Sequence, residues 1–176
     1  MIGVIAAIAV GILQPQQVAA GNGLLIADGG KIVILEPHKW IGRRLPVLRD
    51  IVTAASGRPR QTDRETLEKW LSKGQWVVLF YHASCQECQR TIPLYEALAE
   101  RDAAARSGPR VAFVRVESDP PGPLPAGLFT TNLALHGTLD AKHEWFAATP
   151  AGVELRNGKV LAVATGKAAM NWVWVK

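Results

Sequence analysis

A continuous apolar segment from Gln75 to Tyr81 constrains the fold of this 176-residue chain more than any other feature. It is rich in β-branched and aromatic residues and lacks polar alternation, which is typical of a strand buried on both faces of a sheet. The sequence Cys85-Gln86-Glu87-Cys88 follows and opens a helical pattern that continues to about Arg106. We therefore predict a central strand that leads, through a turn with two cysteines, into a helix.

A short amphipathic helix is predicted before this strand. Thr62 and Glu65 match a capping box, in which the hydroxyl accepts from a helical amide and the carboxylate reaches back. Apolar residues then recur at helical spacing, and Gly74 is a typical helix stop. The tryptophans that we expect in the core are Trp70, Trp76 and Trp145.

The remaining segments extend a mixed α/β order. Asn157-Gly158 lies between two β-rich runs and is the strongest short-range signal for a hairpin. Residues 126–148 mix apolar and polar positions and are interpreted as one or two helices. The other expected strands lie at 31–36, 111–117, 151–156 and 159–164. The predicted order from residue 75 is strand, helix, strand, helix and hairpin.

The two cysteines can form one disulfide at most, which excludes a disulfide-dense miniprotein and a four-cysteine zinc ribbon. A Cys-x-x-Cys pair can be a redox pair, a structural disulfide or half of a zinc site. A helix N-terminus stabilises a thiolate at Cys85, and Cys88 lies one turn further on, so the position favours the redox pair. Zinc would need two further ligands, and no histidine has a helical i, i+4 partner among His38, His82, His136 and His143.

Three features, in order over roughly residues 62–164, resemble the thioredoxin-like superfamily. The first is the strand that runs into Cys85 and Cys88, and the second is Pro93, at the place of the family's kink proline. The third is Thr149-Pro150 before the hairpin, which is similar to the family's cis-proline segment. The resemblance implies a three-layer α/β sandwich with a central mixed sheet and flanking helices.

The same resemblance implies roles for particular residues. Cys85 and Cys88 are the implied catalytic residues, and Thr149 and Pro150 the implied substrate-binding ones. The interval from Cys85 to Pro150 is longer than in plain thioredoxin, which implies an insertion before the cis-proline. The long interval resembles the extracytoplasmic, membrane-tethered thiol-disulfide oxidoreductases of the superfamily.

The chain also departs from the family pattern near the cysteines. Ser84 stands where the family has a tryptophan, and Leu79 stands where thioredoxin has a buried aspartate that accepts a proton. Another base must then serve, and His82 and Glu87 are the nearest candidates for proton transfer. Glu87 beside a thiolate favours a more reducing couple, because it destabilises the negative sulfur.

The N-terminal segment, residues 1–27, carries no charged side chain, and residues 2–13 are apolar or Gly throughout. Twelve helical residues rise only about 18 Å, so the run is too short to span a bilayer alone. A signal peptide cleaved after Ala20, the trailing end of a membrane anchor, and a buried N-terminal helix all remain open. The first two predict an extracytoplasmic or membrane-anchored protein.

The positions of charged residues, Gly and Pro divide the rest of the chain into two parts. Residues 28–61 are interpreted as a loop-rich lead-in with one short strand, and residues 62–176 as the thioredoxin-like domain. The lead-in is basic, but its Lys and Arg are not interleaved with aromatics, so we expect a solvated face and no nucleic-acid partner.

These observations lead to two functional hypotheses. The first is thiol-disulfide exchange or electron transfer on protein disulfides or dithiols, without a metal or cofactor and with a membrane redox partner as a further candidate. The alternative is a non-catalytic binding module of a membrane protein, motivated by Ser84 and Leu79. The first predicts that Cys85 and Cys88 are essential, and the second that they are dispensable.

Overall fold

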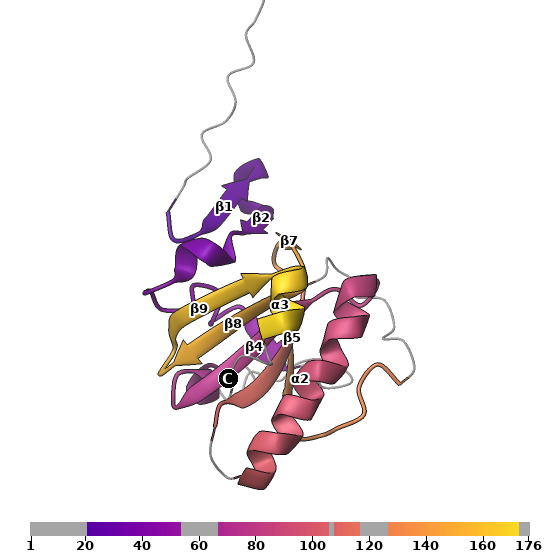
Figure 1. The fold of residues 1–176 in the computed structure, drawn as a ribbon. Coiled ribbons are helices and arrows are strands. Elements are labelled where there is room, and N and C mark those ends of the chain that lie inside the picture. The colour runs from indigo at the N-terminus through magenta and orange to yellow at the C-terminus, as the bar shows by residue number, and fades with distance from the viewer. Residues whose placement is uncertain (1–20, 54–66, 106–107, 117–126, 173–176) are drawn as a thin grey trace, which may run out of the picture.

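The computed structural model describes residues 21–53, 67–105, 108–116 and 127–172, whose strands form two sheets (Figure 1). The three-stranded sheet has the order β1 (Leu24–Ala27), β2 (Ile32–Leu35) and β7 (Glu144–Ala147). The six-stranded sheet has the order β3 (Ile51–Thr53), β6 (Leu135–Leu139), β5 (Arg110–Arg115), β4 (Gln75–Tyr81), β8 (Ala151–Arg156) and β9 (Lys159–Thr165). The larger sheet is mixed, because β4 pairs parallel with β5 and antiparallel with β8.

Two α-helices lie against the six-stranded sheet, α2 (Gln86–Ala105) and the short α3 (Lys167–Trp172), on the same side in Figure 1. Short 3-10 helices are η1 (Asp28–Gly30) and η2 (Pro37–Trp40). Residues 67–71 are also helical, and Gly74 has a φ of 76° after them, as the sequence predicted for a helix stop. The capping box at Thr62 lies outside the described residues.

The central strand is β4, as its apolar run predicted. Every residue of β4 except Gln75 is buried. Alternate side chains point to opposite faces, so Val77, Leu79 and Tyr81 pack with α2, while Trp76, Val78 and Phe80 pack on the other face. The predicted hairpin is confirmed as β8 and β9, with Asn157 and Gly158 at φ values of 52° and 75°.

The core on the face opposite α2 includes much of the predicted lead-in. Trp40 is fully buried and packs edge-to-face on Phe80, with ring centroids 5.7 Å apart. Leu45 and Leu48 join the same cluster, and β3 pairs antiparallel with β6. Residues 40–48 therefore pack on one face of the sheet, giving a third layer, and β3 extends the sheet itself. The proposed domain boundary at residue 62 stays a prediction, because residues 54–66 lie outside the described part.

Residues 126–148 correct one prediction, because β6 and β7 occupy the range interpreted as helical. β6 lies beside β5, and Gly137 lets β3 approach it: a Cβ there would come within 2.8 Å of Ile51 Cγ2. β7 pairs parallel with the distant β2. Local pattern missed both strands because their partners lie far away in sequence.

The tryptophans were predicted with one error. Trp76 and Trp145 are buried, but Trp70 is 46% exposed. Its ring packs edge-to-face against Trp76, and the Arg110 guanidinium lies 5.1 Å from its centroid. Trp70 is therefore part of a surface cation-π cluster.

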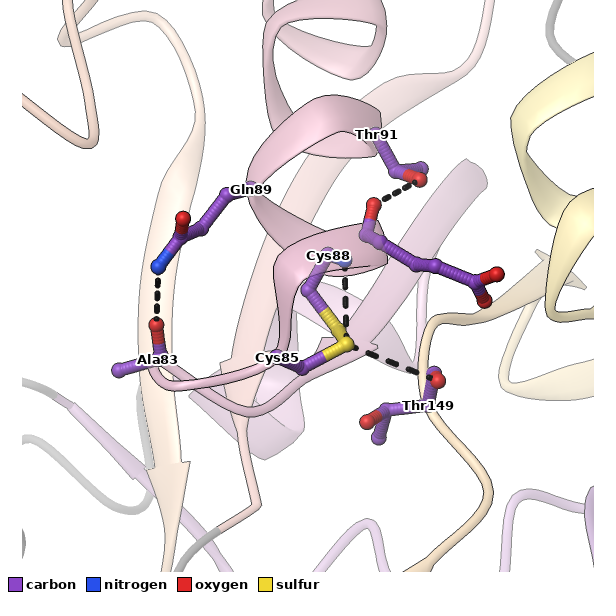
Figure 2. The surroundings of a disulfide bond; sticks show 7 residues. Ala83, Cys85, Cys88, Gln89, Thr91 and Thr149 are labelled. Carbon is purple, nitrogen blue, oxygen red and sulfur yellow. Dashed lines mark hydrogen bonds between the residues drawn. A yellow bond between two sulfur atoms is a disulfide. The ribbon is translucent and has the colours of Figure 1, made fainter.

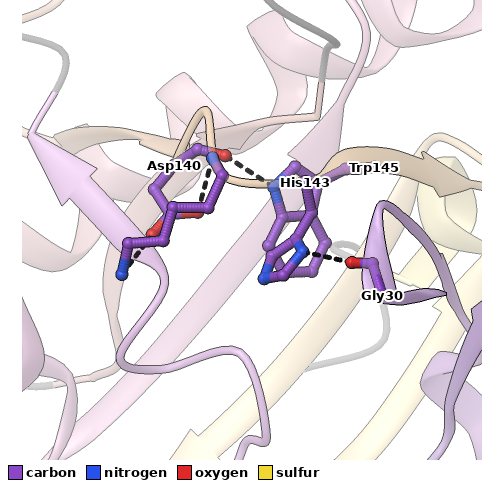
Figure 3. A network of polar contacts seen from close by, with 5 residues as sticks. Gly30, Asp140, His143 and Trp145 are labelled. Carbon is purple, nitrogen blue, oxygen red and sulfur yellow. Dashed lines mark hydrogen bonds and ion pairs between the residues drawn. The ribbon is translucent and has the colours of Figure 1, made fainter.

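A small polar network joins the two sheets at the β6–β7 turn (Figure 3). The indole N–H of Trp145 donates to the carbonyl oxygen of Asp140 at 2.7 Å, and Nδ1 of His143 lies 2.7 Å from the Gly30 carbonyl oxygen. The backbone N–H of Asp140 donates to the Asp50 carbonyl at 2.8 Å. These contacts tie the three-stranded sheet to the edge of the larger one.

The predicted signal or anchor segment lies mostly outside the described residues, which begin at Gly21. Its last residues, Leu24–Ala27, form β1, which pairs with β2. Within the described ranges, no helix combines the length and apolar character that a membrane span requires.

Candidate active site

Cys85 lies at the start of α2, directly after the turn that leaves β4. Its backbone N–H donates to the His82 carbonyl at 3.2 Å, and its own carbonyl accepts the N–H of Gln89 at 3.1 Å. The N–H of Cys88 points at the Cys85 sulfur, with N to Sγ at 3.1 Å (Figure 2). The sulfur thus takes the place of an N-cap acceptor at the positive end of the helix dipole.

Cys85 and Cys88 form a disulfide with a Cα–Cα separation of 5.2 Å. Cys88 is fully buried, whereas Cys85 is half-buried. The two sulfurs therefore differ in access: an incoming group reaches Cys85, and Cys88 faces the core that α2 covers.

The segment at Thr149 and Pro150 faces the disulfide. The Thr149 carbonyl oxygen lies 3.8 Å from the Cys85 sulfur (Figure 2). The Thr149–Pro150 peptide bond is cis, and Pro150 is buried with its carbonyl bonded to the N–H of Gly166 at 2.8 Å. The fold thus brings together four residues that were candidates from the sequence: Cys85, Cys88, Thr149 and Pro150.

Two side chains that sequence reasoning missed hold the turn in place. Nε2 of Gln89 donates to the Ala83 carbonyl at 2.9 Å, and the Thr91 hydroxyl donates to the Glu87 carbonyl at 2.7 Å (Figure 2). Thr91 is fully buried although it is polar. Helical i, i+4 spacing from Glu87 to Thr91 is the only signal in the sequence for the second bond.

The proton-transfer candidates lie on either side of Cys85. His82 is half-buried directly after β4, and Glu87 is half-buried in the first turn of α2. Leu79, at the position of the family's buried aspartate, is fully buried in the same cluster as Cys88. The roles of His82 and Glu87 stay predictions.

Helix α2 also carries a buried carboxylate, Glu96, that was not predicted from the sequence. Glu96 is 4% exposed, and it accepts from the backbone N–H groups of Thr130 and Thr131 at 2.7 and 2.9 Å. The sequence could have indicated this burial, because Glu96 places a charge among the apolar positions of α2, beside Ile92 and Tyr95. Glu96 fixes the segment before β6 against α2.

The neighbouring Tyr95 shows no sign of acid-base chemistry. Burial raises the pKa of its hydroxyl well above the ordinary value, and the hydroxyl donates to the Ala169 carbonyl at 3.1 Å. Tyr95 therefore stays neutral and fastens α3 to α2.

The backbone of His82 bonds to Cys85, whereas the side chains of the other three histidines contact residues other than the cysteine pair. His38 lies near the Thr165 hydroxyl, His143 near Gly30, and His136 stacks on Phe113. Among the residues that the structure describes, no group of three or more His, Cys, Asp or Glu side chains is placed to hold a metal ion.

Comparisons with known proteins give matches to solved structures. No protein-family model matches the chain, and no curated protein matches it. A proposed protein disulfide isomerase from Bacteroides thetaiotaomicron matches with a TM-score of 0.51 at 13% identity, covering 88% of this chain and 91% of that one. This likeness shows the fold: the chain has a thioredoxin-like fold, as its sequence predicted.

Two further solved structures match with lower scores. A thioredoxin-like protein from Bacteroides caccae has a TM-score of 0.45 at 16% identity over 71% of this chain, which spans 46% of that protein. A secreted disulfide oxidoreductase from Mycobacterium tuberculosis has a TM-score of 0.41 at 18% identity, covering 68% of this chain and 84% of that one.

Proposed function

We propose that the protein is a thiol-disulfide oxidoreductase that acts on protein disulfides or dithiols through Cys85 and Cys88. The observation that carries the proposal is the setting of the Cys85 sulfur. It is half-buried at the start of α2, accepts the Cys88 N–H at 3.1 Å, and lies beside the Thr149 carbonyl. A sulfur with such a donor and the helix dipole is stabilised as a thiolate, which is the nucleophile in disulfide exchange.

In the reduced protein, the Cys85 thiolate attacks one sulfur of a substrate disulfide. The substrate S–S bond breaks, a mixed disulfide with Cys85 forms, and the released substrate thiolate takes up a proton. Cys88 then loses its proton, attacks the Cys85 sulfur and releases the second substrate thiol. Two electrons pass to the substrate, and the Cys85–Cys88 disulfide remains; the reverse sequence oxidises a dithiol.

The substrate chain is proposed to lie along Thr149 and Pro150 as an added strand. Their backbone lies beside the reactive sulfur, because the Thr149 carbonyl oxygen is 3.8 Å from Cys85 Sγ. Main-chain pairing of this kind accepts many sequences, which suits an exchange enzyme with protein substrates. His82 and Glu87 are the proposed groups for proton transfer to and from Cys88, by a direct contact or through one water.

The proposed location is extracytoplasmic, with attachment to a membrane or release after cleavage of a signal peptide. The uncharged residues 1–27 support this location, and so does a pair of cysteines that works by forming a disulfide. Fractionation of cells that express the full chain tests it. We expect the protein in the periplasmic or membrane fraction, and recovery in the cytosol alone would contradict this part.

The test of the exchange reaction is a trapping experiment with Cys88→Ser. The variant cannot resolve the mixed disulfide, so we expect covalent complexes with substrate proteins that disappear on reduction. Cys85→Ser is the matched control, because it keeps one cysteine but removes the accessible sulfur. A Cys88→Ser variant that captures nothing, while its Cys85 still reacts with a thiol reagent, would contradict exchange.

A double variant, Cys85→Ser/Cys88→Ser, separates the binding module from the enzyme. A docking domain keeps its partner and its cellular role when both cysteines are replaced by serine. An exchange enzyme loses its role in that double variant. We expect loss, because the half-buried Cys85 sulfur beside Thr149 is accessible, as a sulfur that reacts with substrates must be.

A further inference from the structure

A second candidate site lies away from the cysteines, at the turn of the β8–β9 hairpin. A cavity of about 400 Å³ there is lined by Asn22, Arg43, Arg44, Leu45, Pro46 and Arg49. Three of these six side chains are guanidinium groups. The sequence predicted a basic face on the lead-in, and three arginines of that face line this cavity.

The backbone that carries these arginines is fixed to the hairpin. The carbonyl of Arg43 accepts the N–H of Val160 at 2.8 Å, and the N–H of Leu45 donates to the Gly158 carbonyl at 2.9 Å. Arg44 forms a β-bridge with Lys159. Leu45 is buried in the main core, so packing against the core fixes this wall of the cavity. The site is therefore built on a rigid support, which lowers the entropy cost of binding.

Positive charge exceeds negative charge around the cavity. Among the described residues, the carboxylate paired with these arginines is that of Glu68: its Oε1 lies 3.5 Å from Nη2 of Arg44 and 3.5 Å from Nε of Arg49. Three guanidinium groups and one carboxylate leave a net of two positive charges (3 − 1), and Lys159 adjoins them. The side chains of Arg44 and Arg49 are 65% and 84% exposed, so a ligand in solution can reach their guanidinium groups.

We propose that this cavity binds a phosphate group, as the free ion, in a small phosphorylated molecule, or in a phospholipid headgroup. The planar fork of N–H donors on a guanidinium matches two phosphate oxygens, and several arginines around one cavity satisfy more than one edge of the anion. The net positive charge attracts the anion, and Glu68 holds two of the arginines at the rim.

The site stands apart from the proposed redox chemistry. Arg44 and Leu45 contact the hairpin turn at Lys159 and Gly158. Cys85 contacts Thr149, which lies just before the opposite end of β8. A variant of the arginines therefore leaves the cysteine site intact. The two proposals can fail independently.

The position of Asn22 connects the cavity with the N-terminal segment. Asn22 lines the cavity and follows the end of the apolar run, Leu13, by nine residues (22 − 13). Nine extended residues reach at most about 30 Å. If residues 2–13 enter a bilayer, as the proposed location includes, the arginines lie within reach of its phosphate headgroups.

The test is a titration of the full chain with inorganic phosphate, followed by thermal unfolding against sodium chloride of equal ionic strength. We expect the melting temperature to rise with phosphate beyond the chloride series, because a ligand that binds only the folded state stabilises it. In Arg43→Gln/Arg44→Gln/Arg49→Gln, phosphate affinity is expected to fall at least about tenfold, since charge-assisted hydrogen bonds are lost.

A matched control carries the same loss of charge elsewhere. Lys31→Gln/Lys69→Gln/Lys167→Gln removes three exposed cations outside the cavity and is expected to keep the phosphate response. The single variant Arg43→Gln tests the site without touching the Glu68 pairs, in case the triple variant folds poorly. Equal phosphate responses in the arginine variants and the lysine control, or no response above chloride in the native chain, would overturn the proposal.

Vesicles distinguish the source of the phosphate group. The full chain and both triple variants are mixed with phosphatidylcholine vesicles, with and without phosphatidylglycerol. A headgroup ligand predicts that phosphatidylglycerol increases binding of the native chain and of the lysine control, and that the arginine variant loses this increase. Equal vesicle binding of all three, with the phosphate response retained, assigns the site to a soluble phosphate compound.

Discussion

The two faces of the six-stranded sheet differ in the size and composition of the cores that pack on them. The face opposite α2 packs Trp40, Phe80 and Trp145 into the larger core, and segments from both ends of the described chain meet there. The α2 face has a smaller core, which contains Cys88 and borders polar groups such as Glu96. We therefore expect packing on the α2 face to depend on the state of the disulfide, and packing on the opposite face to be independent of it.

The largest expected effect tests the stabilising face. Phe80→Ala removes a fully buried ring that contacts Trp40, so we expect the free energy of unfolding to fall by about 4 kcal/mol. Urea denaturation measures the loss. Phe146→Ala, which truncates a 46% exposed ring, is the control and is expected to stay within about 0.5 kcal/mol of the native chain. Similar losses in the two variants would break the comparison.

The next effect tests the polar support on the α2 face. Glu96→Ala leaves the N–H groups of Thr130 and Thr131 without their acceptor, and we expect a loss of about 2 kcal/mol in unfolding free energy. Glu96→Gln keeps one acceptor oxygen and is expected to recover part of it. Glu100→Ala, exposed on the same helix, serves as the control. A loss no larger than that of Glu100→Ala would show that Glu96 does not hold this segment.

A third experiment measures the coupling of each face to the disulfide. Ile92→Val and Phe80→Leu are compared in oxidised and reduced protein by urea denaturation. Ile92 lies one helical turn after Cys88 in the same cluster, so we expect its effect to change by at least about 0.5 kcal/mol on reduction. Phe80 lies on the other face, so its effect should be equal in both states. Equal coupling on both faces would remove the distinction.

The smallest expected effect concerns pH. Burial between Phe113 and Phe129 lowers the pKa of His136 below its ordinary value of 6.5, and the charge of Glu96 opposes part of this shift. As the pH falls below 6.5, the unfolded chain takes up a proton that the folded chain resists, so this part of the stability is lost on acidification.

Melting temperatures at pH 7.5 and pH 5.5 test this sign. Between pH 7.5 and pH 5.5, the native chain is expected to lose more stability than His136→Phe does. The difference between these two losses is expected to be smaller than the loss caused by Glu96→Ala. His38→Gln, at an exposed histidine, is expected to behave like the native chain. A His136→Phe variant with an unchanged pH dependence would contradict the assignment to His136.

Elements with a strong local signal could be predicted, and those defined by distant partners could not. β4 was predicted from its unbroken apolar run, and the β8–β9 turn from Asn157-Gly158. β7 was interpreted as helix because its one partner among the described strands is β2, more than a hundred residues earlier. Trp70 was expected in the core because residue type alone does not reveal that Arg110 covers its ring at the surface.

The candidate site divides in the same way. Cys85, Cys88, Thr149 and Pro150 could be named from motif order, and the structure brings them together. Gln89, Thr91 and Glu96 were not named, because their partners are backbone groups that become neighbours only after folding. Polar side chains that bond to backbone carry little sequence signal.

The sequence alone determined the strand-turn-helix unit with its cysteine pair, because hydrophobic period, helix start and turn chemistry are local properties of the chain. Only the tertiary structure decided that the Cys85 sulfur faces the Thr149 carbonyl, 64 residues further on, and that three lead-in arginines border one cavity. Such neighbours are set by the packing of two cores on one sheet, and that packing depends on all the strands together.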